Sequence, residues 1–359
     1  MSSGEIDLTI FSNYQLLRRD MRHRLSILLL LAGFLVVGCR SNLPRDCASA
    51  SNCIGQDLSN RNLEGYDFSD MLLMDAKLTK ANLVNANLVN ANLTGASLVE
   101  TDMESADLSG AKLIGADLTL ANLRNARMDN VDLSGANLRG TSLIRVDLRT
   151  AKMHGVRLKS AEMVGCDLSQ VDISGVGIDQ ANLSGATLVG ANFNGGVLSL
   201  SNFSGAIMHD ASITGAWMNL ISLVGADLNG ANLSGSVIFG ADLTGAKLSD
   251  AKLNGVNLVG TNLSGADLRG ADLTGAILIV PKPPGSSANF TYDSLTGSDL
   301  LLALNQTEMA KALADQRVAD LTEVRLKPLI VDAILQGVIY DQNTIWPVGY
   351  DIPPSAILK

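Results

Sequence analysis

The sequence predicts an all-β solenoid, a rod built from short stacked coils, and three observations carry this prediction. Between Asp57 and Ile279 every fifth residue is apolar, and all 45 such positions hold Leu, Ile, Met or Phe. The residue two positions earlier is usually small, which makes the consensus Ala-Asn/Asp-Leu-Ser/Thr-Gly. The period of five matches neither the helical period of about 3.6 nor the strand period of 2, and it persists as an internal repeat.

Each five-residue unit is predicted to form one short side of a coil. In extended backbone, residues i and i−2 point to the same side, so the apolar residue and the small residue before it both face inward. The Ser/Thr-Gly or Ser/Thr-Asn pair that follows suits a corner, because Gly and Asn tolerate turn conformations. One such side cannot bury its apolar residues alone. Coils must therefore stack, which also pairs their backbone groups.

This pattern resembles the pentapeptide-repeat family over residues 57–279. The resemblance implies a right-handed quadrilateral parallel β-helix with four pentapeptides per coil. At about 4.8 Å between neighbouring coils, the repeat domain, residues 57–280, would form a solenoid of about 11 coils. Leu58, Leu78, Leu98 and Leu118 are then expected to stack in one column.

The composition of the chain restricts the classes of function. The net charge is −9 over 359 residues, and aromatic residues make up only 4%, which suits a thin rod better than a globular core. Apolar residues make up 47%, which excludes general disorder. The acidic balance argues against direct nucleic-acid binding, which requires a basic surface. It leaves open mimicry of a nucleic acid.

Residues 1–38 are predicted to be a lipoprotein signal peptide. An apolar run at residues 25–37 follows a basic stretch, and Met21 is the alternative start that fits such a signal better. The run is too short for a comfortable membrane-spanning helix. Its end, Leu-Val-Val-Gly before Cys39, resembles a bacterial lipobox, which implies that Cys39 is acylated and anchors the exported chain to a membrane.

Residues 39–56 are predicted to be a polar tether. Cys47 and Cys53 lie within it and are positioned to form a disulfide outside the cytoplasm, with two free thiols as the alternative. Cys166 occupies an inward position where the consensus has Ala. It is therefore predicted to be a small buried residue rather than a nucleophile.

Charge is distributed unevenly along the repeats. Residues 121–160 carry 3 acids and 8 bases, while the segments on both sides are acidic. Two interpretations stand: a docking belt for an anionic partner, or a solvated surface with local ion pairs to Asp129, Asp132 and Asp147. The sequence favours the second. The basic candidates for an interaction surface are Arg124, Arg127, Arg145 and Arg149.

Apolar residues replace the usual Asn or Asp at three positions that lie 20 residues apart. Val197, Trp217 and Val237 are expected to form an exposed apolar stripe on one side of the rod, and such a stripe can mark an interface. The alternative is a face that the C-terminal part of the chain covers.

The regular repeat ends near Pro281. Residues 281–317 are predicted to be a Pro-rich break followed by a short helical insert, with helices starting at Ser298 and Thr307. Residues 318–359 are predicted to resume the coil briefly and then to cap the rod. The sequence around Tyr340 and Trp346 resembles a tail that follows many pentapeptide arrays.

The sequence holds no constellation typical of an enzyme, and it suggests no catalytic residue, metal site or cofactor. The function it favours is a non-enzymatic, membrane-anchored scaffold or protein-interaction module on the exported side of a cell membrane, with a protein partner that the sequence does not identify. The alternative is a DNA-mimicking modulator of DNA gyrase or topoisomerase, as the family resemblance suggests. The predicted export signal argues against this alternative.

Overall fold

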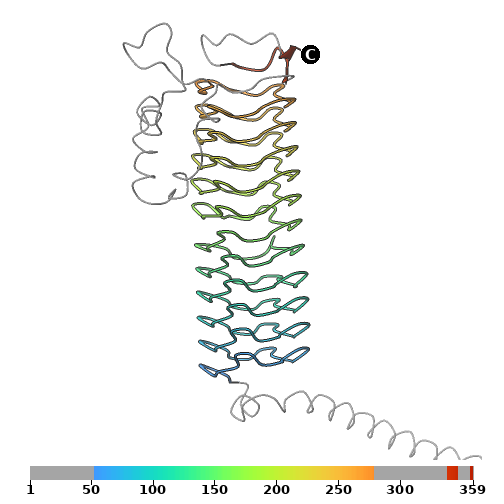
Figure 1. Ribbon diagram of the computed structural model, residues 1–359, viewed down its shortest axis with the longest axis vertical. Coiled ribbons are helices and arrows are strands. Elements are labelled where there is room, and N and C mark those ends of the chain that lie inside the picture. The colour runs from blue at the N-terminus through green and yellow to red at the C-terminus, as the bar shows by residue number, and fades with distance from the viewer. Residues whose placement is uncertain (1–51, 279–337, 347–355, 359) are drawn as a thin grey trace, which may run out of the picture. The chain divides into compact units, whose positions relative to one another are not determined.

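The computed structural model describes residues 52–278, 338–346 and 356–358. By its internal contacts the chain divides into two units, Met1–Asn52 and Cys53–Lys359. All described residues except Asn52 belong to the second unit, a rod of stacked coils (Figure 1). The predicted signal peptide, most of the tether and the 281–317 insert lie outside the described residues.

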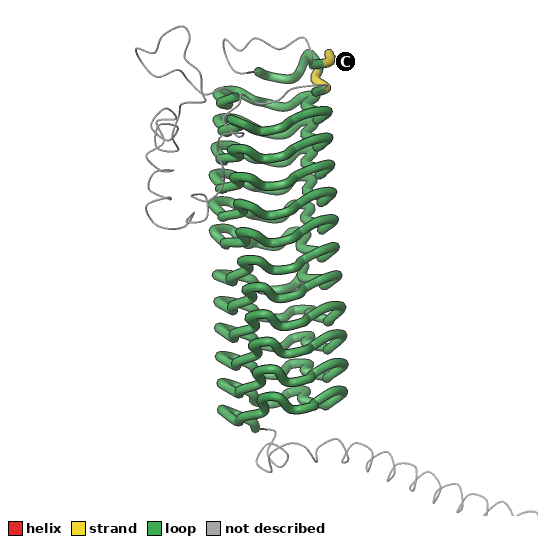
Figure 2. The backbone as a smooth tube through the Cα atoms, in the orientation of Figure 1, coloured by secondary structure: helices red, strands yellow, loops and turns green. Residues whose placement is uncertain are grey.

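The coils pair in parallel with a constant register of 20 residues. Isolated β-bridges join Asp57 to Lys77 at one end of the repeats and Asn257 to Ile277 at the other. Four pentapeptides therefore make one coil, and Leu58, Leu78, Leu98 and Leu118 stack in one column, as predicted. Each side contributes a single bridging residue between two turns, so the sides are too short to form regular strands (Figure 2).

The inward-facing pair is confirmed for most pentapeptides. Leu58 and Leu168 at the apolar position are 0% exposed, and so are Ala76 and Ala136 at the small position. Burying each Leu contributes about 1.5–3 kcal/mol of transfer free energy, most of which offsets the entropy of ordering the chain. The core is thus two columns of side chains on each of four sides.

The corners require left-handed backbone. The corner residue has a positive φ, near 69° at Gly95, 56° at Asn85 and 59° at Leu120. Among the described corners from Gly55 to Gly275, Thr150 alone lacks it. Gly and Asn supply this conformation at least cost, which explains the consensus.

Four faces run along the rod, and we label them by their outward bridging residues. Face A contains positions 57, 77 and so on to 277, and face B contains 62 to 262. Face C contains 67 to 267, and face D contains 72 to 272. The residue that follows the inward apolar residue, for example Ser59 on face A, is the first turn residue of the same face.

The ladder between coils is interrupted about midway along the rod (Figure 2). No bridge joins Arg127 to Asp147 on face C, Lys152 to Asp172 on face D, or Arg157 to Gly177 on face A, although all these residues are described. On face B the ladder continues, with Ser142 paired to Glu162. We call this three-sided interruption the seam.

Larger side chains lie inside the rod near the seam. The small inward position holds Val146, Val156, Val171 and Val176 in this stretch, and all four are buried. A Val in place of Ala adds volume to a close-packed core. Ile221 and Val256 occupy the same inward position where the ladder is continuous, so this added volume alone does not explain the seam. Ala151, at the same inward position, is half-exposed, which shows that the coil is open there.

The chain returns to the rod near its C-terminus. Strand β1, Ile339–Tyr340, pairs with the last coil through a bridge from Ile339 to Asp267 on face C. Beyond β1, Ile345 pairs with Asp272 on face D. Strand β2, Ile357–Leu358, pairs in parallel with β1. The rings of Tyr340 and Trp346 meet edge to face, 5.6 Å apart. The predicted coil at residues 319–326 lies outside the described residues.

Candidate interaction surfaces

Face A carries the apolar column that the sequence suggested. Val197 bridges to Trp217 and Trp217 to Val237, so the three side chains stack at successive coils. All three are half-buried, whereas the sequence suggested an exposed stripe. Because these side chains are half-buried, they expose less apolar surface to a partner than a fully exposed stripe would.

Beside this column, face A buries residues that sequence reasoning missed. The first turn residues Ser199, Asn219, Phe239 and Val259 are 4%, 2%, 7% and 0% exposed. On faces B, C and D every described first turn residue is exposed or half-exposed. The available signal was the apolar character of Phe239 and Val259, where the consensus has Ser or Thr.

A depression of ≈ 380 Å³ lies along the edge between faces D and A. It is lined by the corner glycines and face A residues Gly215, Trp217, Gly235, Ser236, Val237, Gly255 and Asn257. Asn257 is 2% exposed, and its Oδ1 accepts a hydrogen bond from the Val259 N–H at 3.1 Å. Within the part of the chain that the structure describes, its Nδ2 has no hydrogen-bond partner, and neither does Oδ1 of the buried Asn219.

Two of the four basic candidates make ion pairs with nearby acids, and the other two do not. On face C, Arg127 lies 3.2 Å from Asp107 and 3.4 Å from Asp129, and Arg149 lies 2.6 Å from Asp147. The hydrogen bond from Arg149 lowers the pKa of Asp147. Lys152 pairs likewise with Asp132 at 3.8 Å. These bases are neutralised locally by the three acids that the sequence suggested.

On face B and its corner, Arg124 and Arg145 are exposed and make no ion pair with any described residue. The same holds for Arg139 and Arg157 on face A. The structure therefore separates the eight bases of residues 121–160 into two groups. Four pair with nearby acids on faces A, C and D, and four arginines make no ion pair with any described residue. Exposed pairs contribute little to stability, about 0–1 kcal/mol each.

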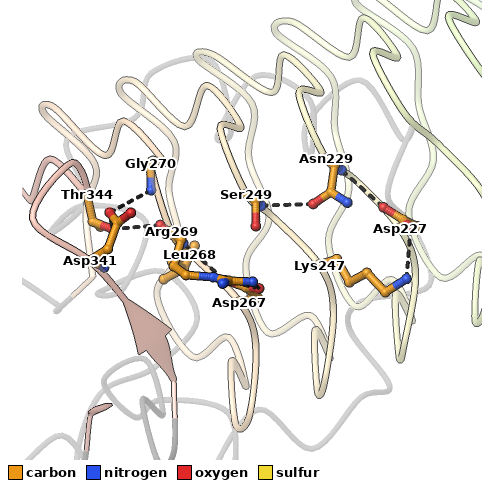
Figure 3. Close-up of polar contacts among 10 residues, drawn as sticks. All are labelled: Asp227, Asn229, Lys247, Ser249, Asp267, Leu268, Arg269, Gly270, Asp341 and Thr344. Carbon is orange, nitrogen blue, oxygen red and sulfur yellow. Dashed lines mark hydrogen bonds and ion pairs between the residues drawn. The ribbon is translucent and has the colours of Figure 1, made fainter. Parts of the chain in front are cut away.

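Face C carries a polar ladder over its C-terminal half (Figure 3). Asp227 accepts from Lys247 Nζ at 2.9 Å and lies 3.0 Å from His209 Nε2. Two coils beyond Asp227, the Arg269 guanidinium binds Asp267 and lowers the pKa of that carboxyl. Because each acid is satisfied by its neighbours, this ladder supports the rod rather than providing reactive groups.

The ladder continues into the C-terminal segment. The Gly270 N–H donates to Asp341 Oδ1 at 3.0 Å, and the Thr344 hydroxyl donates to the Leu268 carbonyl at 2.8 Å (Figure 3). The bond from Gly270 lowers the pKa of Asp341. Thr344 is 8% exposed, so this contact is largely shielded from water. Two side chains thus fasten the segment to the last repeats.

The cysteines have different environments. Cys166 is a free, buried thiol, and burial raises its pKa to about 12, so it is not a nucleophile at neutral pH. Cys53 is buried and takes part in a disulfide bond. Cys39 and Cys47 lie outside the described residues, so acylation of Cys39 and pairing of Cys47 with Cys53 stay predictions.

Within the described ranges, no group of three or more His, Cys, Asp or Glu side chains is arranged to hold a metal ion. The two histidines of the rod, His154 and His209, lie on different faces, D and C. The same part of the chain contains no helix long and apolar enough to cross a bilayer.

The fold and its surfaces define a four-sided solenoid that displays side chains in straight columns. A family model described as pentapeptide repeats, spanning eight copies, matches overlapping segments that cover residues 51–170 and 181–278. The chain belongs to the pentapeptide repeat family, whose fold is the right-handed quadrilateral β-helix. No curated protein matches the chain significantly.

Solved structures of this family are similar to the chain. HetL, a pentapeptide repeat protein involved in heterocyst differentiation regulation in the cyanobacterium Nostoc, is 32% identical over 63% of this chain and 93% of its own, with a TM-score of 0.28. Rfr23 from the cyanobacterium Cyanothece is 33% identical over 31% and 88%, with a TM-score of 0.30. QnrB1, a plasmid-mediated fluoroquinolone resistance protein, is 16% identical over 63% and 90%, with a TM-score of 0.18.

Proposed function

We propose that this protein is a non-enzymatic scaffold or protein-interaction module, held by a lipid anchor on the exported side of a cell membrane. The interaction role is supported by the apolar residues on face A. There Val197, Trp217 and Val237 replace the polar residues of the consensus and stack at successive coils. Trp is a residue type that often dominates the binding energy of protein interfaces.

The rod suits the display of such a surface. Backbone N–H groups pair from coil to coil, for example Trp217 N–H with the Gly196 carbonyl at 2.9 Å. Columns on one face therefore repeat at about 4.8 Å, the spacing of neighbouring strands. A partner that contacts several coils meets side chains at fixed intervals, which reduces the entropy lost on binding.

The anchor is supported by the sequence before the rod. Cys39 follows a basic stretch and a short apolar run, and a polar tether separates it from the first repeat. One acyl chain holds a protein on a membrane only marginally, so stable anchoring requires several chains, such as a bacterial lipoprotein carries.

Metabolic labelling with a fatty-acid analogue tests the anchor. Wild-type protein is compared with Cys39→Ala, followed by separation of membrane and soluble fractions. The control is Cys166→Ala, which removes a thiol but restores the consensus residue inside the rod. We expect label and membrane retention in wild type and in Cys166→Ala, and loss of both in Cys39→Ala.

An unlabelled, soluble wild-type protein would contradict the anchor. A cytoplasmic location would then make gyrase modulation the function to examine. A supercoiling assay with the chain lacking residues 1–39 examines it directly, and no effect at micromolar protein would exclude it.

A further inference from the structure

Three basic side chains lie on adjacent coils of face A, where the seam crosses this face. Arg139 is a first turn residue, Arg157 is the outward bridging residue of the next coil, and Lys159 is the first turn residue of that coil. The bridge from Asn137 to Arg157 holds the two coils in register. Arg139 and Arg157 are exposed, and Lys159 is half-exposed. We call these three residues the basic cluster.

The register of the coils brings Arg139 and Arg157 within reach of each other. They are related as a first turn residue and the bridging residue 18 positions later, on the next coil. One coil earlier on face A, the same relationship joins Thr119 to Asn137, whose Nδ2 donates to the Thr119 Oγ1 at 2.9 Å. Side chains in this relationship therefore meet at hydrogen-bonding distance, and the two guanidinium groups can approach one ligand together.

Among the described residues, no acid pairs with either arginine of the basic cluster. On face C the same spacing of 18 places Arg149 Nε 3.4 Å from the Asp167 carboxylate. On face A the corresponding partner of Arg139 is a second guanidinium, that of Arg157. Two like charges on neighbouring side chains repel each other, and an anion bound between them replaces this repulsion with attraction.

Lys159 and a backbone N–H extend the cluster. Lys159 Nζ lies 3.1 Å from the Asp179 carboxylate, so the three bases and this acid have a formal net charge of +2. In the coil that follows Arg157, Gly177 occupies the outward bridging position and has no side chain there. In the regular register its N–H would donate to the Val156 carbonyl, but no described backbone carbonyl accepts from it. The seam thus leaves a free donor beside the bases.

We propose that the basic cluster binds a phosphomonoester group. Guanidinium groups bind phosphate oxygens through paired, charge-assisted hydrogen bonds. A phosphomonoester carries about −1.5 to −2 charges at pH 7 and three acceptor oxygens, which matches the net charge and the several donors of the site. A carboxylate, with one charge and two oxygens, matches them less well. The inference depends neither on the lipid anchor nor on the apolar residues of face A, so it and the proposed function can fail separately.

Isothermal titration calorimetry of the full-length chain with inorganic phosphate, at fixed ionic strength, tests the site. The test variant combines Arg139→Gln with Arg157→Gln. The matched control combines Arg124→Gln with Arg145→Gln, which removes the same charge from two exposed arginines on face B and its corner. We expect the test variant to bind phosphate about tenfold more weakly or worse, because two charge-assisted hydrogen-bonding groups are lost. The control variant should bind like the wild type, and both should unfold at the wild-type temperature.

Vesicle co-sedimentation distinguishes two sources of the phosphomonoester. Phosphatidylcholine vesicles are compared with and without phosphatidic acid, whose headgroup is a phosphomonoester. Sedimentation that requires phosphatidic acid and is lost in the test variant assigns a lipid headgroup as the ligand. Binding of inorganic phosphate without this dependence on phosphatidic acid assigns a soluble phosphate ester.

The proposal is wrong if the wild type binds neither inorganic phosphate nor the phosphatidic acid vesicles. Equal weakening in the test and control variants would also contradict it, because this result would show diffuse attraction to the basic residues rather than a site. Acetate that binds as tightly as phosphate would show a surface for carboxylates instead.

Discussion

The backbone N–H of Asn130 donates to the Oγ1 of Thr150 at 2.8 Å, one coil away. In the regular register this N–H would donate to the carbonyl of the residue before Thr150, as Gly110 N–H donates to Asp129 O at 2.7 Å. Thr150 is also the described corner without a positive φ. A side chain thus replaces a backbone partner at the point where the chain crosses the seam.

The seam predicts local exchange of amide hydrogens. Among the described residues, no backbone carbonyl accepts from the N–H of Asp147 or Asp172, while the N–H groups of Asp107 and Asp132 donate at 2.9 Å to the coil below. A hydrogen bond contributes about 1 kcal/mol net, so Asp147 and Asp172 should exchange roughly fivefold faster or more. Hydrogen exchange with residue-level mass spectrometry measures this. Equal protection of all four would show that the seam is closed in solution.

The central column predicts severe damage from a buried charge. Leu168 is 0% exposed, and Leu168→Asp places a carboxylate without a partner among apolar side chains. We expect a loss of about 4 kcal/mol or more and a clear fall in the unfolding temperature. Leu120→Asp is the control, because Leu120 is 58% exposed and its substitution should change stability little. Calorimetry measures the unfolding temperature of both variants. An unchanged unfolding temperature for Leu168→Asp would contradict the stacked core.

The attachment of the C-terminal segment predicts an effect of Thr344. Its hydroxyl donates to the Leu268 carbonyl and accepts from the Asp341 N–H at 3.1 Å. Thr344→Val keeps the shape but leaves both groups without this partner, which should cost about 1–3 kcal/mol locally. We expect faster exchange at Ile345, whose N–H donates to Ala271, and no change at Asp107. Unchanged exchange at Ile345 would mean that Thr344 does not hold the segment.

The carboxylates predict destabilisation in acid. Hydrogen bonds from Arg149 and Arg269 lower the pKa of Asp147 and Asp267. A lowered folded pKa means that the unfolded chain binds protons first, so this stabilisation is complete above about pH 4, the unfolded Asp value, and is lost as the pH falls through the folded pKa. Denaturant titrations at pH 7 and at pH 3 should show lower stability at pH 3. Asp267→Asn should reduce the difference, and a larger difference would contradict the assignment.

The sequence alone determined the coil and its register. Every fifth residue from Leu58 to Leu278 is apolar, and the small residue two before it faces the same way, so the pattern specifies both inward columns. The corner residues, such as Asn85 and Gly95, were equally predictable because their conformational requirement is local. These features repeat in each pentapeptide, and a local rule applied repeatedly determines a regular solenoid.

The tertiary structure alone decided which coils separate, which arginines stay unpaired and which outward residues are buried. The seam lies beside Val146 and Val176 but no interruption occurs beside Val256, so the inward residue type alone does not specify it. Arg127 pairs with Asp107 one coil earlier. Arg124 makes no such pair with a described residue, although Glu104 occupies the equivalent turn position one coil earlier and accepts a hydrogen bond from Asn122 instead. These outcomes depend on which particular side chains meet within a coil and between neighbouring coils, which a five-residue pattern does not encode.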